Sequence, residues 1–326
     1  MKNGTGGTGT LGERPTAAAT PWLYLDGDFV RMSEVRLTPS IQALNYGTGV
    51  FEGIRAYWNS AQQELYALRL RDHYERFADS CGFLRLDLPA SADELVDVTV
   101  DLLRRNGHRG HTYIRPLAYK RSFEPGVPFG VKLRGVTTSL SLHTVPMGST
   151  VSGLGLRCGV SSWRRIPDTS LPARAKITGG YANNALAVDE VHAAGFDEAI
   201  LLNQAGTVAE ASTSNVFLVR RGELVTPPPS ADILEGITRA CVTELARDEL
   251  GTVPVERAVA RSELYTADEV FLTGTGIEIQ PVCEVDGRKV GRGVPGPVTT
   301  RLRELYHRAV RGEDDRYRHW LTPVEL

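Results

Sequence analysis

The pattern of apolar and polar positions predicts short strands and amphipathic helices from residue 22 onward. Residues 22–32, WLYLDGDFVRM, predict two short strands around an Asp26-Gly27 turn, a dipeptide typical of tight hairpins. Residues 92–107 place leucine and valine on one side of a helix, and Gly107 predicts its end.

Further segments show either the alternation of apolar and polar residues typical of strands or the spacing typical of helices. Strands are predicted over residues 64–70, 112–119, 155–163, 197–203, 207–219 and 269–275, and helices over 72–84, 181–195 and 237–251. Pro116 lies inside one predicted strand, which indicates an edge strand or an irregular one. Strands and helices are interleaved without regular βαβ alternation, so the pattern predicts an α+β fold.

The chain of 326 residues is long enough for two domains. Residues 1–20 are rich in glycine, threonine and alanine and predict a disordered tail. Proline, glycine, serine and threonine cluster over residues 144–150, where we place an inter-domain linker. The predicted domains are therefore a small one at 21–143 and a larger one at 151–326.

Composition narrows the class of partner and the cellular compartment. The formal charge is −2, so neither nucleic acid nor an anionic membrane is an expected partner. No apolar run approaches the roughly 20 residues of a membrane span, and the first residues lack the apolar core of a secretory signal. Four scattered cysteines fit a reducing cytoplasm. The seven histidines form no metal-binding motif, so no metal is expected.

Two side chains stand in unusual contexts. Lys176 lies in PARAKITGGYANNALA, where it is either a surface lysine near a helix start or an amine that forms a Schiff base. Glu210 lies in the apolar stretch VAEASTSNVF. A carboxylate there either faces water at a strand end or pairs with a buried cation, such as a protonated pyridine nitrogen.

Two further segments suit an anion. Gly236, Ile237 and Thr238 open a predicted helix, where free N–H groups and a hydroxyl can bind phosphate. Thr275 lies between two glycines directly after a predicted strand, and such a turn exposes backbone amides. A plain helix cap and an ordinary loop are the alternatives.

In this order along the chain, these segments and several others resemble the fold-type IV pyridoxal-phosphate enzymes, and specifically the branched-chain amino acid aminotransferases. The resemblance extends over roughly residues 22 to 312. The matching segments are residues 43–57, 70–77, 113–117, 161–163, 172–187, 210–217, 235–239, 264–282, 285–288 and 296–299.

The resemblance implies the cofactor pyridoxal 5′-phosphate and a set of residues around it. Lys176 would hold the cofactor and then move the proton at the substrate α-carbon, and Glu210 would pair with the pyridine nitrogen. Tyr181 would hydrogen-bond the ring hydroxyl, and Arg71 would bind the phosphate. The remaining phosphate contacts implied are Gly236, Ile237, Thr238 and Thr275.

The resemblance also implies a substrate pocket. Tyr113 and the Thr275-Gly276 turn would take the α-carboxylate, and Arg115 the distal carboxylate of glutamate. The walls of the side-chain pocket would be Tyr46, Phe51 and Trp163.

The implied reaction is a ping-pong transfer. An L-branched-chain or related hydrophobic amino acid becomes a 2-oxo acid, and 2-oxoglutarate becomes L-glutamate. The implied architecture has a small α/β domain and a larger domain with a β-barrel-like core, in a homodimer that shares its active sites.

Several alternatives stay open. Residues 120–130, KRSFEPGVPFG, depart from the glycine-rich, methionine-containing loop of the family, which favours a specialised transaminase with an unusual amino acid. An aminodeoxychorismate lyase or a transaminase for D-amino acids or (R)-amines would need the same lysine and carboxylate. A cofactor-carrying protein without turnover is the non-enzymatic interpretation.

Overall fold

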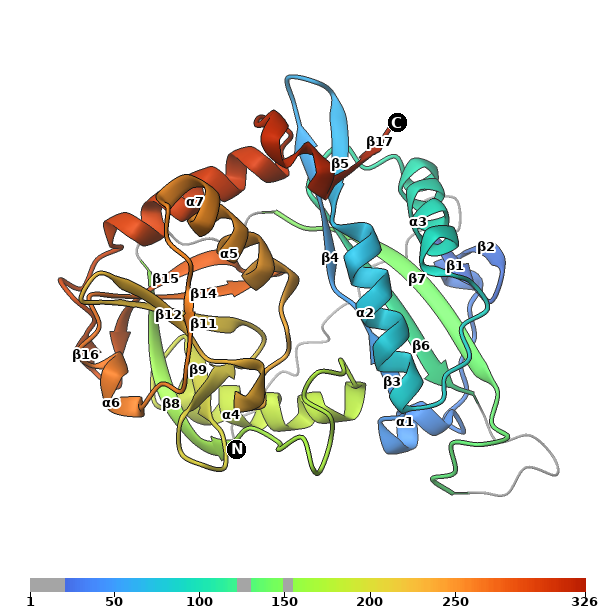
Figure 1. The fold of residues 1–326 in the computed structure, drawn as a ribbon. Helices are drawn as coiled ribbons and strands as arrows, with labels where there is room; N and C mark the ends of the chain where they lie inside the picture. Colours follow the sequence, from blue (N-terminus) through green and yellow to red (C-terminus); the bar gives the residue numbers. More distant parts are fainter. Residues whose placement is uncertain (1–20, 122–129, 149–154) are drawn as a thin grey trace, which may run out of the picture.

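The computed structural model describes residues 21–121, 130–148 and 155–326. The predicted tail, most of the segment 120–130 and part of the predicted linker lie outside these residues. Two β-sheets with helices against them form the described chain, and the segment between strand β8 (Leu156–Arg164) and helix α4 (Tyr181–Ala193) runs between the two halves (Figure 1). The α+β class predicted from the pattern is confirmed.

The first sheet has eight strands, all antiparallel, in the order β17-β5-β4-β6-β7-β1-β2, with β3 also paired to β6. Its strands are β1 (Trp22–Leu25), β2 (Asp28–Arg31), β3 (Gly49–Phe51), β4 (Ile54–Asn59), β5 (Glu64–Leu68), β6 (Thr112–Lys120), β7 (Thr138–Pro146) and β17 (Leu321–Val324). The β1–β2 pair, with Leu25 opposite Asp28, is the predicted hairpin.

The second sheet has nine strands in the order β10-β9-β8-β15-β14-β11-β12-β13, with β16 paired to β15. It is mixed, because β8 runs parallel to both β9 and β15. Its strands are β8 (Leu156–Arg164), β9 (Glu198–Leu202), β10 (Val208–Ala211), β11 (Asn215–Arg220), β12 (Glu223–Thr226), β13 (Val255–Glu256), β14 (Glu269–Gly274), β15 (Glu278–Val285) and β16 (Arg288–Lys289).

Seven α-helices and four short 3-10 helices occupy the described residues. The α-helices are α1 (Gln42–Tyr46), α2 (Leu70–Phe83), α3 (Ala92–Asn106), α4 (Tyr181–Ala193), α5 (Ile237–Leu250), α6 (Arg261–Leu264) and α7 (Pro297–Val310). The 3-10 helices are η2 (Met32–Glu34), η3 (Thr178–Gly180), η4 (Pro229–Ala231) and η5 (Asp315–Trp320). Helix α3 ends at Gly107 in the left-handed conformation, as the sequence predicts. No helix of the described residues is long and apolar enough to cross a membrane.

Strand β6 corrects one expectation. Pro116 predicts an edge or irregular strand, yet β6 lies inside the sheet between β7 and the pair β3 and β4. The missing N–H is tolerated because the neighbouring strand is interrupted opposite it: β3 ends at Phe51, β4 begins at Ile54, and Glu52 N–H donates to the Pro116 carbonyl at 3.0 Å. The irregularity is therefore in the partner strand.

The C-terminal segment returns to the first sheet. Strand β17 pairs with β5, with Leu321 opposite Leu68, although it follows the helices of the second half. The division of the chain at residues 144–150 stays a prediction. Strand β17 lies after this division in the sequence but belongs to the first sheet.

A backbone seam joins the segment after β8 to the first sheet. Val50 of β3 and Ile177 form an isolated antiparallel bridge, and Phe51 N–H donates to the Lys176 carbonyl at 3.1 Å. Gly47 and Gly179 meet beside it so closely that a Cβ on Gly47 would lie 2.6 Å from the Gly179 Cα. The seam therefore fixes the backbone of Lys176 against β3.

Candidate active site

The Lys176 side chain lies between two aromatic rings. Its amine donates to the Tyr181 hydroxyl at 2.5 Å, and it lies 4.8 Å from the centre of the Phe51 ring. Tyr181 is the first residue of α4, five positions after the lysine, and its ring meets Phe51 edge to face at 4.7 Å. Lys176 precedes the short helix η3 rather than opening a helix itself. The structure thus brings Lys176, Tyr181 and Phe51 together.

Tyr113 and Arg115 extend this cluster from β6. The Arg115 guanidinium lies 4.4 Å from the centre of the Phe51 ring, and its Nη2 donates to the Tyr113 hydroxyl at 2.7 Å. The Arg115 Nε is buried and has no hydrogen-bond partner among the described residues. Gly53 makes room for the tyrosine, since a Cβ on it would lie 2.1 Å from the Tyr113 hydroxyl.

Glu210 is a buried carboxylate on β10 with several partners. Its Oε2 accepts from the Asn215 side chain and from Leu234 N–H, both at 3.1 Å, and Arg165 Nε lies 2.8 Å from its Oε1. Burial raises the pKa of Glu210, while Arg165 and Lys176 act in the opposite direction. Of the two interpretations of Glu210, the structure supports the buried, paired carboxylate.

The start of α5 forms the other end of the site. Its N-cap is Gly236, which has no side chain to occupy the free N–H groups, and Thr238 is buried in the first turn. Asn215 links this helix start to Glu210, because it also donates to the Leu234 carbonyl at 2.8 Å. A Cβ on Gly236 would lie 2.0 Å from the Asn215 side-chain oxygen, so only glycine fits here.

The structure does not place Arg71 at this site. Its side chain is 63% exposed on α2 and forms ion pairs with Glu75 and Asp93, at 3.0 and 2.7 Å. Arg76 follows five residues later, about 140° around the same helix. It donates to the Glu235 carbonyl at 2.8 Å, beside the start of α5. Burial lowers the pKa of Arg76, but Glu52 and, to a lesser degree, Tyr181 and Glu210 raise it. Arg76 therefore replaces Arg71 as the candidate phosphate ligand.

Thr275 and Gly276 form the turn between β14 and β15. A Cβ on Gly274 would lie 3.1 Å from both Ser214 Cβ and the Thr213 carbonyl, so this turn packs on the segment that follows Glu210. Buried Arg55 donates to the Gly276 carbonyl at 3.3 Å and lies 3.5 Å from Glu278. The turn is thus held from β4 of the first sheet.

Tyr46 and Trp163 have partly exposed side chains, at 38% and 45%. Tyr46 ends α1 directly before Gly47 of the seam, and Trp163 lies near the end of β8. Their roles as pocket walls stay predictions.

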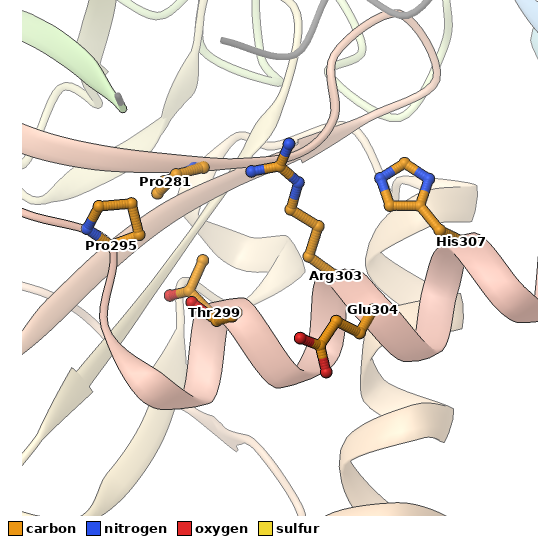
Figure 2. Close-up of a pocket in the computed structure, with 7 residues that line it drawn as sticks. Pro281, Pro295, Thr299, Arg303, Glu304 and His307 are labelled. Atoms are coloured by element: carbon orange, nitrogen blue, oxygen red, sulfur yellow. The ribbon is translucent and has the colours of Figure 1, made fainter. Parts of the chain in front are cut away.

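A small hollow borders this cluster. It has a volume of about 20 Å³ and lies beside Tyr181, between Arg165 and Leu234. A larger hollow, of about 250 Å³, lies between α7 and β15, where Arg303 points toward the strand that carries Pro281 (Figure 2). The cluster around Lys176 is the one that brings the predicted chemistry together.

Comparison with known proteins agrees with this geometry. The family model for class IV amino-transferases matches residues 49–285. A probable branched-chain-amino-acid aminotransferase of Aquifex aeolicus is 45% identical over 302 residues, which are 92% of this chain and 96% of that protein. The chain belongs to the class IV branched-chain amino acid aminotransferases.

Solved structures of such aminotransferases have the same fold. The enzyme of Thermoproteus uzoniensis with norvaline is 44% identical, with a TM-score of 0.88 over 94% of this chain and 100% of that one. The T.th. enzyme complexed with N-(5′-phosphopyridoxyl)-L-glutamate is 40% identical, with a TM-score of 0.88 over 94% of this chain and 99% of that one.

Sequence reasoning misses several residues of this aminotransferase site: Glu52, Arg55, Arg76, Arg165 and Asn215. The apolar stripe of α2 gives no signal for Arg76, since Arg71 lies nearer to the buried Leu70, Tyr74 and Phe77 around the helix than Arg76 does. The buried polar residues His73 and Ser80 extend the inner face of α2 to Arg76, and the apolar pattern does not mark them. Arg165 and Asn215 carry no signal either, because the folding of the chain brings them to Glu210.

The buried pair of Glu52 and Arg76 predicts a pH dependence of stability. Arg76 and His73 hold the pKa of Glu52 well below its ordinary value of 4.5. A lowered carboxyl pKa adds stability that is fully present above the unfolded pKa and is lost as the pH falls. We therefore expect the free energy of unfolding of wild type relative to Glu52→Gln to be constant above about pH 6 and to shrink below 4.5. Urea unfolding at several pH values measures it, and a constant difference down to about pH 3.5 would contradict the ion pair.

Proposed function

We propose that this aminotransferase binds pyridoxal 5′-phosphate and moves the amino group of an L-branched-chain or related hydrophobic amino acid to 2-oxoglutarate. The observation that carries the proposal is the Lys176 amine held by Tyr181 and Phe51, with buried Glu210 near enough for the lysine charge to oppose the rise in pKa that burial causes. Two solved relatives contain norvaline and N-(5′-phosphopyridoxyl)-L-glutamate, which supports both halves of the reaction.

The residues present fit this cofactor. The glycine-capped start of α5 offers free amides for a phosphate, and Arg76 lies beside it. The Thr275 turn would supply a further phosphate contact, and Tyr181 would hydrogen-bond the ring hydroxyl. When bound, the pyridine ring withdraws electrons from the amino acid α-carbon.

Lys176 would hold the cofactor and afterwards carry the proton at the substrate α-carbon. An amine that moves a proton must stay within hydrogen-bond reach of the reacting atom after it leaves the cofactor. The Lys176 backbone is fixed by the Phe51 N–H, while its side chain has the Tyr181 hydroxyl as partner and the Phe51 face as wall. The fixed backbone would therefore keep the Lys176 amine close to the cofactor, while its side chain remains able to move.

Glu210 would hold the proton on the pyridine nitrogen. A carboxylate accepts at about four sites. Asn215 and Leu234 occupy two of them, and Arg165 lies against the other oxygen. Arg165 favours the ionised form, while burial favours the protonated one. Glu210 is thereby poised to share a proton with a buried ring nitrogen.

The pocket must accept both an apolar side chain and a carboxylate. Phe51 supplies an apolar face, and the Arg115 guanidinium stacked on that face keeps its Nε available. A distal carboxylate of glutamate or 2-oxoglutarate would pair with Arg115, whereas an aliphatic side chain would pack on Phe51.

The same proposal includes a homodimer in the cytoplasm. Leu44 and Tyr46 on α1 and Trp163 on β8 expose apolar side chains at 71%, 38% and 45%. A second copy covering them would bury this surface and bring further residues to the pocket.

A half-reaction screen tests the function. Purified protein with pyridoxal 5′-phosphate is mixed singly with L-leucine, L-isoleucine, L-valine, L-glutamate, D-alanine and an (R)-amine, and the cofactor absorbance is followed. We expect the L-branched-chain acids and L-glutamate to convert it and Lys176→Ala to be at least about a thousandfold slower. Conversion by L-glutamate alone would indicate a specialised transaminase, and conversion by no donor would favour the lyase.

Arg115→Ala separates the two substrates. We expect kcat/KM for L-glutamate and 2-oxoglutarate to fall by about a hundredfold and that for L-leucine by less than about threefold, because only the former present a distal carboxylate. Arg71→Ala, which removes an exposed arginine, is the matched control. Equal losses for L-leucine and L-glutamate would show that Arg115 does not bind the distal carboxylate.

A further inference from the structure

Glu52 is a fully buried carboxylate next to the pocket wall Phe51, in the break between β3 and β4. It contacts two charged or titratable side chains of α2. Its Oε2 lies 2.8 Å from His73 Nδ1 and 2.9 Å from Arg76 Nη2, and its Oε1 accepts from Arg76 Nε at 2.7 Å. Gly53 N–H also approaches Oε2, at 3.2 Å. Few carboxylates are buried so completely unless a cation pairs with them.

The pairing with Arg76 is bidentate. Nε and Nη2 form one edge of the planar guanidinium, and both donate to Glu52. The remaining nitrogen, Nη1, donates to the Glu235 carbonyl at 2.8 Å, directly before the glycine cap of α5. Glu52 thus fixes the plane of the guanidinium and turns Nη1 toward the helix start.

His73 completes the arrangement without adding charge. It is 1% exposed, and burial lowers its pKa; the contact with Glu52 opposes this shift, and the charges of Arg76 and Lys176 add to it. The neutral ring donates from Nδ1, because Glu52 can only accept there. The trio of Glu52, His73 and Arg76 is therefore close to neutral, and the charge of Arg76 is balanced before any phosphate arrives.

We propose that Glu52 is a positioning residue that holds the Arg76 guanidinium ready to bind the phosphate group of the cofactor. The proposal rests on the proposed function, in which Arg76 binds that phosphate. The long side chain of an arginine otherwise loses rotamer freedom when it binds a ligand, which costs conformational entropy. The bidentate contact with Glu52 restricts Arg76 before the phosphate binds, so less entropy is lost on binding.

The variant Glu52→Gln keeps the shape and removes the charge. An amide offers one acceptor oxygen and one NH2 group, so it cannot accept from Nε and Nη2 of Arg76 on two separate oxygens as the carboxylate does. Glu52→Asp keeps the charge but withdraws the carboxylate by one methylene, which preserves neutrality while breaking the two-point contact. Arg71→Gln, on the exposed face of the same helix, is the matched control.

The test compares pyridoxal 5′-phosphate with pyridoxal, which lacks the phosphate. The dissociation constant of each from the full-length apoprotein is measured by the visible absorbance of the bound cofactor. We expect Glu52→Gln to raise the dissociation constant of pyridoxal 5′-phosphate by about 10- to 100-fold and Glu52→Asp to raise it by about tenfold. The dissociation constant of pyridoxal should change by less than about threefold in both variants. Arg71→Gln should leave both constants unchanged.

Equal weakening of the two cofactors by Glu52→Gln would overturn the proposal, because a general distortion of the site does not distinguish them. If Glu52→Gln does not fold, Glu52→Asp alone tests the proposal, by the same comparison of the dissociation constants of pyridoxal 5′-phosphate and pyridoxal. Arg76→Gln separates the two claims: should it leave the preference for pyridoxal 5′-phosphate intact, Arg76 is not the phosphate ligand and the proposal falls. Wild-type protein that binds neither compound would contradict the proposed function itself.

Discussion

The hydrogen bond from Phe51 N–H to the Lys176 carbonyl is the contact on which the site depends. It belongs to a short seam in which Val50 bridges Ile177 and two glycines meet beside it. Without the seam, Lys176 would lie on a connecting segment between two sheets. With it, one backbone contact fixes the lysine and, through Phe51, the pocket wall that the lysine faces.

Buried ion pairs form a second constraint. Glu52 pairs with Arg76, Glu210 with Arg165 and Arg55 with Glu278, and the side chains involved are at least largely buried. Such pairs contribute little net stability, because removing both charges from water offsets their attraction. Each of them instead holds a site element in place: the start of α5, the carboxylate on β10, and the turn after β14. Their positions are explained better by the needs of the site than by stability.

Much of the architecture could be predicted from the sequence, because strand and helix periods are local properties. The first hairpin, helix α3 with its glycine end and the segment around Lys176 are examples. The sequence could not show that a break in the neighbouring strand accommodates Pro116, or that β17 returns to the first sheet, since both depend on pairing between distant segments. Motif position alone selects Arg71 over Arg76, and the apolar stripe of α2 does not correct this choice, because it is the polar residues His73 and Ser80 that extend the buried face to Arg76.

The central claim is that Lys176 is the residue that binds the cofactor, and one measurement tests it most directly. Holoenzyme is reduced with borohydride, digested, and the peptides are analysed by mass spectrometry. We expect the pyridoxyl group on Lys176. A pyridoxyl group on Lys2, Lys120, Lys132 or Lys289 instead, or on no lysine, would contradict the claim.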